Sequence, residues 1–480
     1  MNTSNQILSM VSLVGLQLST PLLVNGQKEH PNVLMIIIDD LNDYPEVLSN
    51  YPGLKTPNLT KFAKTAVTFN HAYCAAPVCN PSRAAFLSGM APYKTGVYDN
   101  NYPVEKSPVI LKSEFLPEHF KKNGYITFTR GKVFHTIPGK ERFDAMWDIN
   151  EGKGNYGPYP KTSHFPDSLG MAKGFDYLPW EGPESDHPDN ITAEKTIAQL
   201  KKDHDKPFFI TCGFYKPHNP WTAPKRFFDR YPLDSLQMPP VLESDWDDLP
   251  EIAKRWAAGP TDYYSALKKT GQTARVVRSY LACISFLDYN FDRVIAALEN
   301  SEYRDNTIVV VIADNGFHMG EKKHFTKYAL WEKTTHILSM WRVPGMTKPN
   351  TVCQHPVNLL DIYPTLDELC KLGAPVQDLD GHNIVPLLEN PDSDWKYPSV
   401  TTYLKDNYAV RDERYRYIQY NDGSCELYDH LTDGNEYHNL LVSQPDKYKD
   451  IVAKLKAYIP KHSVNGITNS SNPFGFEKKP

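Results

Sequence analysis

The sequence has no internal repeat, no low-complexity tract and no C-x-x-C pair. Its seven cysteines are an odd number without zinc-type spacing, which argues against a thiolate zinc site and against a full disulfide framework. Basic residues are not in excess, because 52 Lys and Arg stand against 57 Asp and Glu. The net charge of -5 argues against a nucleic-acid-binding protein with a broad basic face, although it is compatible with a local pocket for a small anion.

Long apolar runs are also scarce. Residues 7–24 form an uncharged apolar stretch followed by polar residues, as in the hydrophobic region of a signal peptide, although no Lys or Arg precedes it. This pattern predicts a signal peptide over residues 1–26 and a periplasmic or secreted protein. No other segment of the sequence predicts an integral membrane helix.

The chain is long enough for more than one hydrophobic core. With 480 residues, of which 40% are hydrophobic, it predicts a large α/β domain over residues 27–390 and a smaller α+β subdomain over residues 391–480. The 39 prolines and 29 tyrosines indicate many long surface loops, which commonly carry functional sites on an α/β scaffold.

Four apolar runs each stop at a cluster of polar residues. The runs are residues 33–38, 125–129, 208–213 and 307–313, and each is typical of a buried strand. The clusters that follow them are, in the same order, Asp39-Asp40, Lys132 with His135, Lys216-Pro217-His218, and Asp314-Asn315. Ligands of open parallel sheets bind beyond the carboxyl ends of the strands, so we expect these clusters to converge on one crevice.

The segments between these runs favour an α/β fold with a mainly parallel sheet between helices. Residues 146–190 are rich in Gly, Pro, Asp and aromatic residues without periodicity, which predicts a long loop that walls a pocket. Residues 399–428, with a turn at Asn421-Asp422-Gly423, predict a small antiparallel sheet. Predicted helices are residues 192–202, 273–299 and 446–459.

The segment that begins at Cys79 carries the most chemical information. Pro81 suits the first turn of a helix, since its missing N–H would lack a partner there. Cys79 therefore lies just ahead of a helix N-terminus, where the backbone dipole favours an anion, and Arg83 is able to reach back to the same point. The alternative is a buried structural cysteine before an amphipathic helix, which is the usual interpretation of an isolated Cys-x-Pro.

The pentad Cys79-Asn80-Pro81-Ser82-Arg83, followed by Leu87-Ser88-Gly89, resembles the signature of type I sulfatases. The similarity runs through most of the chain. Further residues in family order are Asp39-Asp40, Lys132, His135, Lys216-Pro217-His218, Asp314-Asn315, Lys327, Glu426-Leu427-Tyr428-Asp429 and Asn439-Leu440. The segments around Lys132 and His218 are most similar to the iduronate-2-sulfatase branch, whereas Asn315 differs from the His that this branch often has and Ser88 from the commoner Thr.

This resemblance implies an alkaline-phosphatase-like sandwich and a modified nucleophile. The family cysteine, here Cys79, is oxidised to formylglycine (3-oxoalanine) by a formylglycine-generating or sulfatase-maturating enzyme. Its hydrated aldehyde attacks sulfur, and its second hydroxyl allows sulfate to leave after His135 takes the proton. In the earlier step, when sulfur is attacked and the alcohol departs, His218 and Lys327 act at the leaving group. The positions that match the family's catalytic residues are Cys79, Arg83, Lys132, His135, His218 and Lys327.

The strand-end oxygens predict a metal site. Carboxylate and amide ligands suit one hard divalent cation, and the resemblance implies that it is Ca²⁺. The alternative is that carboxylates at strand ends cap the following helices, which is common for one such pair and less so for two. The predicted ligands are Asp39, Asp40, Asp314 and Asn315.

The resemblance also implies a substrate class. It predicts hydrolysis of sulfate esters on carbohydrates, with exo action on a 2-O-sulfated uronic acid or related sugar of a glycosaminoglycan or algal glycan. Two alternatives stay open: a phosphonate or phosphate monoester hydrolase of the same superfamily, and a carbohydrate-binding protein whose cysteine is never modified. Candidate substrate contacts, each equally expected as an ordinary polar or half-buried residue, are Asn100, Trp221, His318 and His324.

Overall fold

The computed structural model describes residues 30–49, 51–172, 174–259 and 261–467. The predicted signal peptide, residues 1–26, lies outside these ranges. Within them, no helix combines the length and the apolar character that crossing a membrane requires.

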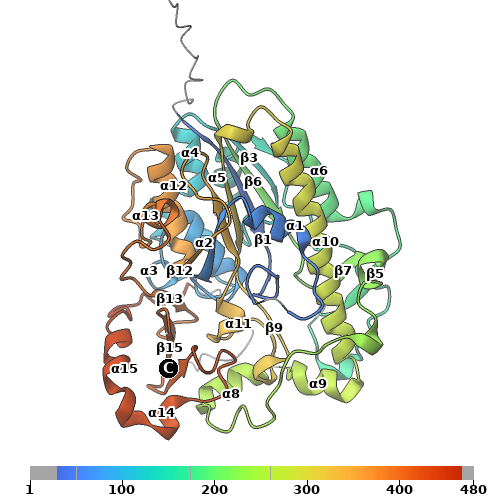
Figure 1. The fold of residues 1–480 in the computed structure, drawn as a ribbon, viewed down its shortest axis with the longest axis vertical. Coiled ribbons are helices and arrows are strands. Elements are labelled where there is room, and N and C mark those ends of the chain that lie inside the picture. Colours follow the sequence, from blue (N-terminus) through green and yellow to red (C-terminus); the bar gives the residue numbers. More distant parts are fainter. Residues whose placement is uncertain (1–29, 50, 173, 260, 468–480) are drawn as a thin grey trace, which may run out of the picture.

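An eight-stranded mixed sheet forms the centre of the molecule (Figure 1). β11 is antiparallel to both of its neighbours, and all other neighbouring strands pair in parallel. The strands, in spatial order, are β12 (Thr351–Asn358), β2 (Val67–Tyr73), β11 (Ser339–Arg342), β8 (Thr307–Ala313), β1 (Asn32–Ile38), β6 (Phe208–Phe214), β3 (Ile126–Gly131) and β4 (Ile149–Asn150). Every residue of β1, β6 and β8 is buried, which explains why these strands read as continuous apolar runs.

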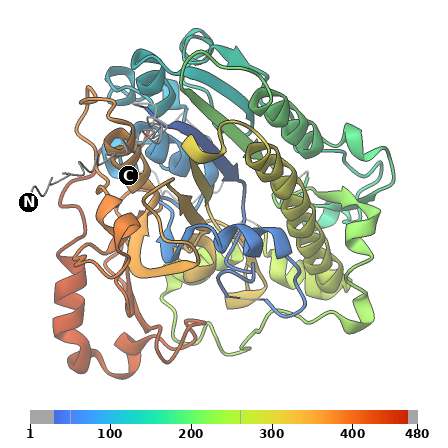
Figure 2. The same ribbon diagram turned by 45° about the horizontal axis from the view of Figure 1, so that its top comes forward.

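Helices cover both faces of the sheet, as the views in Figures 1 and 2 show. α6 (Pro188–Leu200) and α10 (Thr273–Glu299) pack together on one face. The predicted bounds of α10 are confirmed, whereas α6 begins four residues earlier than predicted because Pro188 occupies its first turn and the His187 side chain accepts a hydrogen bond from the Asp189 N–H. The opposite face carries α2 (Cys79–Ser88), α4 (Leu116–Lys122) and α12 (Ile362–Cys370).

The remaining elements are short. Two pairs of strands lie outside the large sheet: β5 (Tyr177–Trp180) with β7 (Trp221–Pro224), and β9 (His318–Met319) with β10 (Phe325–Thr326). The other α-helices are α1 (Pro57–Ala63), α3 (Pro92–Thr95), α5 (Lys140–Ala145), α7 (Lys225–Phe228), α8 (Glu251–Ala258), α9 (Tyr263–Thr270), α11 (Glu332–Thr335), α13 (Val385–Glu389), α14 (Leu440–Ser443) and α15 (Lys449–Lys456). The predicted loop over residues 146–190 is largely irregular but contains β4 and β5.

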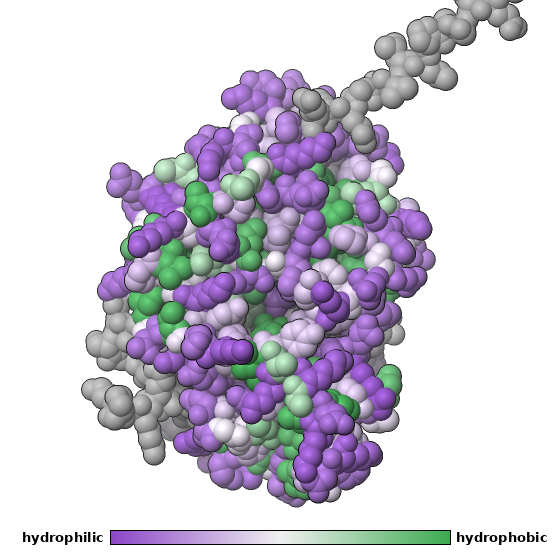
Figure 3. All heavy atoms as spheres, turned by 90° about the vertical axis from the view of Figure 1, so that its left-hand side faces the viewer, coloured by the Kyte–Doolittle hydropathy of each residue, from purple (hydrophilic) through white to green (hydrophobic). Residues whose placement is uncertain are grey.

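The C-terminal part contains the predicted antiparallel sheet. Its strands are β13 (Ser399–Thr402), β14 (Tyr408–Arg411), β15 (Tyr415–Gln419) and β16 (Cys425–Asp429). The expected turn joins β15 to β16, with Gly423 at a φ of 87°. The sheet packs against α15 through a small core of its own that includes Val410, Tyr417 and Leu455. The face of the molecule on this side is mostly hydrophilic with scattered apolar groups (Figure 3).

Two glycines bring the ends of β3 and β6 unusually close together. Gly131 and Gly213 are direct partners in the parallel register. A Cβ atom at Gly213 would lie 2.4 Å from the backbone carbonyl of Lys132, closer than any real contact. The missing side chain therefore lets Lys132 turn in beside the end of β1.

We expect Gly213→Ala to lower the free energy of unfolding by about 1–3 kcal/mol, because the added methyl must displace the backbone at Lys132. Denaturant titration of the purified protein measures this change. Gly434→Ala is the matched control, since a Cβ there meets no atom within 4 Å. Equal stability of the two variants would contradict the close approach.

Candidate active site

The carboxyl ends of four parallel strands meet at one buried cluster of charges. Asp39 and Asp40 follow β1, and Asp314 follows β8. Lys132 follows β3, and His218 lies four residues beyond β6. The structure thus brings the four polar clusters of the sequence to one place, as expected from the parallel order of their strands.

Three buried carboxylates lie together in this cluster. Oxygen atoms of Asp39, Asp40 and Asp314 all lie within 4.8 Å of one another, and none of the three residues is exposed. Asp40 has a φ of 60°, a costly conformation for a residue with a side chain, and its N–H donates to Asp314 Oδ1 over 3.1 Å. Asn315 donates its amide to Asp40 Oδ1 over 2.8 Å, while its own buried Oδ1 has no hydrogen-bond partner among the described residues.

Three cations compensate these carboxylates. Arg83 joins two of them, with Nε 2.7 Å from Asp314 Oδ2 and Nη2 3.1 Å from Asp39 Oδ1. Lys132 pairs with Asp39, and Lys327 Nζ lies 2.6 Å from Asp40 Oδ1. The formal charges therefore cancel within the cluster.

The pKa values of the carboxyl groups show how far the cations compensate for burial. Burial raises the pKa of Asp39, but Lys132, His218 and Arg83 outweigh it and hold that pKa well below its usual range. Burial raises the pKa of Asp314 to about 6, because Arg83 opposes it only in part and the other carboxylates add to it. A further positive charge at this point would relieve the crowding.

The acidic cluster fits a hard divalent cation. Its donors are carboxylate oxygens, no thiolate pair accompanies them in the described chain, and the free Asn315 Oδ1 supplies one more oxygen. All of the predicted ligands, Asp39, Asp40, Asp314 and Asn315, therefore lie together.

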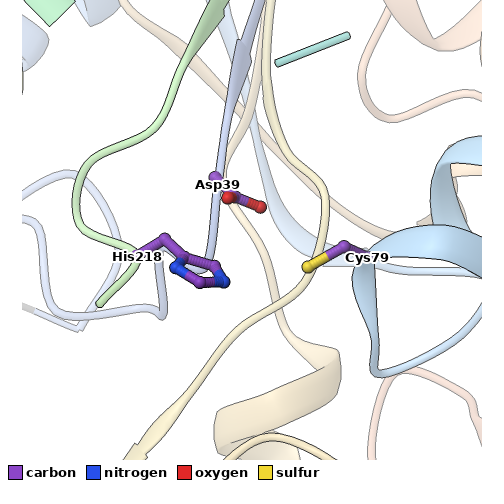
Figure 4. A group of neighbouring side chains, drawn as sticks. All are labelled: Asp39, Cys79 and His218. Carbon is purple, nitrogen blue, oxygen red and sulfur yellow. The ribbon is translucent and has the colours of Figure 1, made fainter. Parts of the chain in front are cut away.

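Cys79 is the first residue of α2 and points into the same space as Asp39 and His218 (Figure 4). Its Sγ lies 2.8 Å from Lys327 Nζ and 3.5 Å from Lys132 Nζ. Burial and the carboxylate of Asp39 nevertheless raise the pKa of this thiol well above its ordinary value, despite the two lysines. The raised pKa favours the thiol over the thiolate in the unmodified side chain.

Both candidate catalytic histidines are held neutral. Burial lowers the pKa of His218 to about 3, and the nearby carboxylates only partly offset this. Its Nδ1 contacts the Asn219 carbonyl oxygen, and its Nε2 lies 3.6 Å from Asp40 Oδ2. Burial, together with Lys132 and Lys153, lowers the pKa of His135 well below its ordinary value.

Two neighbours of the site escaped the reasoning from sequence. The Tyr156 ring lies 4.6 Å from the His218 ring and 5.1 Å from Lys132 Nζ, so it packs between them. Lys153 donates to the His135 carbonyl oxygen over 2.6 Å. Both belong to a glycine-rich segment, EGKGNYG, whose composition was the available signal. Lys216 is a structural neighbour, as predicted, because its Nζ donates to three backbone carbonyl oxygens.

An aromatic pocket of about 180 Å³ adjoins the charged cluster. Phe175, from the long loop over residues 146–190, is part of its wall, as the loop prediction required. Of the candidate substrate contacts, Asn100 and His324 line this pocket. Its other main lining residues are Trp256, Tyr263, Phe317 and Tyr328, with His218 and Lys327 at the charged end.

The other two candidate contacts lie elsewhere. Trp221 is fully buried in β7, where its ring packs edge-on against Phe175 and Phe317. His318 is also fully buried, beside the rings of His324 and Trp331. The structure therefore places neither side chain where a sugar reaches it, because neighbouring aromatic rings cover both.

Comparisons with known proteins agree with this arrangement. The family model described as Sulfatase matches residues 31–371, and that of the N-sulphoglucosamine sulphohydrolase C-terminal region matches residues 320–465. The chain is 36% identical over 468 residues to a sulfatase of Formosa agariphila, with 94% of this chain and 90% of that protein covered. It is 30% identical over 357 residues to an iduronate 2-sulfatase of Mus musculus, with 68% and 61% covered.

A solved structure is similar in fold. The phosphonate monoester hydrolase of Agrobacterium radiobacter matches with a TM-score of 0.71 at 18% identity, over 89% of this chain and 95% of that one. At this identity the likeness shows the fold alone, and it confirms the predicted alkaline-phosphatase-like sandwich.

We expect the wild-type protein to bind one divalent cation and Asp314→Ala to lose it, because the variant removes a ligand from a set of three carboxylates. Metal analysis after gel filtration measures the stoichiometry with Ca²⁺ and with Mg²⁺. At a cation concentration one hundred times Kd, bound metal adds about 2.7 kcal/mol to stability, and this gain should vanish in the variant.

Asp288→Asn is the matched control for this experiment. Asp288 is also a buried aspartate, but its carboxylate accepts hydrogen bonds from the backbone of Asn58 and Leu59 at the start of α1. Its variant should keep the metal. Unchanged stoichiometry in Asp314→Ala would overturn the assignment.

Proposed function

Because this chain belongs to the sulfatase family, whose members are sulfuric ester hydrolases, we propose that it removes sulfate from a 2-O-sulfated uronic acid or related sugar at the end of a glycan chain. One observation carries the proposal: Cys79, at the start of α2, lies in contact range of Lys132 and Lys327 above an acidic cluster. This arrangement offers positive charge to a compact anion placed over the Cys79 side chain.

The nucleophile of the proposed reaction is Cys79 after oxidation. The raised pKa of the thiol makes the unmodified side chain a poor nucleophile. Formylglycine at this position would supply a hydrated aldehyde whose hydroxyl attacks sulfur. Cys79 stands at the helix N-terminus, where the backbone N–H groups of α2 favour the negative charge that develops there.

The cations of the cluster stabilise the sulfate oxygens. Asp39, Asp40, Asp314 and Asn315 would hold the divalent cation, and we propose that it is Ca²⁺, which supplies Lewis-acid stabilisation of negative charge. Lys132 and Lys327 now pair with carboxylates. With the carboxylates neutralised, their ammonium groups would turn to the sulfate oxygens.

The two histidines supply the proton transfers. His135 is neutral and its Nδ1 has no hydrogen-bond partner among the described residues, so it is able to accept a proton from the nucleophile side. His218 contacts the Asn219 carbonyl through Nδ1, which leaves Nε2 to face the reacting centre. A bound sulfate anion raises the pKa of His218, and we propose that it then protonates the leaving oxygen.

The aromatic pocket receives the sugar. Its wall of Phe175, Trp256 and Tyr263 offers apolar faces for a saccharide ring, and Asn100 offers a hydrogen bond. A pocket of this size favours a chain end over the middle of a chain. The signal-like residues 1–26 support export to the periplasm or beyond, where the protein would encounter glycosaminoglycans or algal glycans. A maturating enzyme would modify Cys79 before export.

We expect Cys79 to be converted to formylglycine when the protein is produced with a formylglycine-generating enzyme, since it alone among the seven cysteines precedes Pro-Ser-Arg. The tryptic peptide is residues 65–83, and it also contains Cys74. Fragmentation by mass spectrometry should place the aldehyde on Cys79 and leave Cys74 as a thiol.

The matched variants are Cys79→Ala and Cys74→Ala. The first should lower kcat about a thousandfold or more, because it removes the nucleophile. The second should keep both aldehyde and activity, since the Cys74 side chain lies in the hydrophobic core, where its Sγ donates to the Thr334 carbonyl oxygen. Full activity from protein whose Cys79 is entirely thiol would defeat the mechanism.

We expect the highest kcat/KM on a disaccharide that ends in a 2-O-sulfated uronic acid. The measurement compares matched 2-O-, 4-O- and 6-O-sulfated saccharides, each with and without the uronate carboxylate. Preference for a 6-O-sulfated neutral sugar would exclude the proposed position of the sulfate. Hydrolysis of phosphonates with no hydrolysis of sulfate esters would exclude sulfatase chemistry itself.

A further inference from the structure

A glycine-rich segment, residues 152–157, crosses the edge of the site, and we call it the strap. It follows β4, which pairs in parallel with β3, so it leaves the sheet at the same edge as the active-site residues. Gly152, Gly154 and Gly157 have φ values of 81°, 73° and 107°, which favour glycine. The Gly152 carbonyl oxygen accepts a 3.0 Å hydrogen bond from the Gly131 N–H, which ties the strap to the end of β3.

The strap delivers two side chains to the charged cluster. Tyr156 packs against Lys132 and His218 on one side. Lys153 Nζ donates to the His135 carbonyl oxygen over 2.6 Å. The strap therefore contacts both candidate catalytic histidines, His218 through the Tyr156 ring and His135 through Lys153.

Lys153 differs from the three cations of the charged cluster in having no carboxylate partner. Arg83, Lys132 and Lys327 each pair with an aspartate. In the described chain, no carboxylate oxygen lies within 4.0 Å of Lys153 Nζ, and its one hydrogen bond goes to a carbonyl. It is nonetheless only partly exposed.

Among the described residues, no nearby carboxylate neutralises the ammonium group of Lys153. The pKa of Lys153 is lowered to about 8, mainly by burial. The neighbouring Lys132 and Arg83 lower it too, and Asp39 offsets only part of their effect. An anion bound beside Lys153 Nζ would remove this penalty. The backbone contact with His135 positions the ammonium group near the reacting centre without neutralising it.

We propose that Lys153 binds the carboxylate of the sulfated uronic acid and so selects this sugar. The inference rests on the proposed function, because it takes a sulfate over Cys79 as its fixed point. In a 2-O-sulfated uronic acid the carboxylate is attached to C5, across the ring from C2, while the glycan continues from C1. The carboxylate then meets Lys153, while the ring that carries it packs in the aromatic pocket at His218.

Other basic side chains near the pocket are less suited to this task. Lys323 bonds to the Glu243 carbonyl oxygen and lies over the Trp246 ring. His324 has a backbone carbonyl oxygen 2.8 Å from each ring nitrogen, and burial lowers its pKa. Lys323 does not line the pocket, and both ring nitrogens of His324 already have hydrogen-bond partners.

The test compares wild type with Lys153→Met, Lys153→Arg and Lys161→Met. The substrates are a disaccharide ending in a 2-O-sulfated uronic acid, its carboxyl-reduced counterpart, and a neutral sugar carrying a second sulfate. In Lys153→Met the ratio of kcat/KM for the uronate to that for the reduced sugar should fall about 10- to 100-fold, mainly through KM. Lys153→Arg should restore much of the ratio. Lys161 is exposed in the same loop but outside the strap, so its variant should leave the ratio unchanged.

Binding in the absence of turnover separates this inference from the proposed function. Calorimetry on Cys79→Ala with the same three saccharides gives Kd ratios that need no catalysis, and Lys153→Met in that background should abolish the preference for the carboxylate. An unchanged ratio in both assays overturns the role of Lys153 even when sulfate is released. Tighter binding of the disulfated neutral sugar overturns the choice of carboxylate. No hydrolysis of any sulfate ester by mature wild type overturns the proposed function instead.

Discussion

The structure depends on holding three aspartate carboxylates together away from water. Asp39, Asp40 and Asp314 have no exposed surface, and each alone would carry a large desolvation penalty. Arg83 compensates two of them at once from the first turns of α2. The same contact fixes the helix that begins with Cys79. Compensation of the buried charges therefore also determines where the Cys79 side chain lies.

The topology of the sheet explains where this cluster forms. β1 and its neighbours β6 and β8 are buried along their whole length, so polar side chains are tolerated where the strands end. Parallel order brings those ends to one edge, and the close pair Gly131 and Gly213 lets a third chain segment approach them. Burial of the strands and concentration of charge at their ends are therefore two results of one topology.

Much of this arrangement was predictable from sequence because its signals are local. The four strands are marked by continuous apolar runs, and α10 by apolar residues at helical spacing, so both were found with nearly correct bounds. The roles of the strap and the burial of Trp221 were not predictable from the sequence. Residues 152–157 have no periodicity, and Trp221 is covered by Phe175 and Phe317, which are distant in sequence. Long-range packing leaves no local pattern from which to predict it.

The C-terminal sheet contributes to the site without entering it. Lys327 lies on an irregular segment between β10 and α11, which by itself would not fix an ammonium group against Asp40. Buried ion pairs supply the missing rigidity: Glu332, at the start of α11, pairs with Arg416 of β15. Arg416 also pairs with Glu436, whose carboxylate accepts a hydrogen bond from the Glu332 N–H. Because breaking one member would leave a buried charge uncompensated, this network holds the segment that carries Lys327 and makes the smaller sheet part of the architecture of the candidate active site.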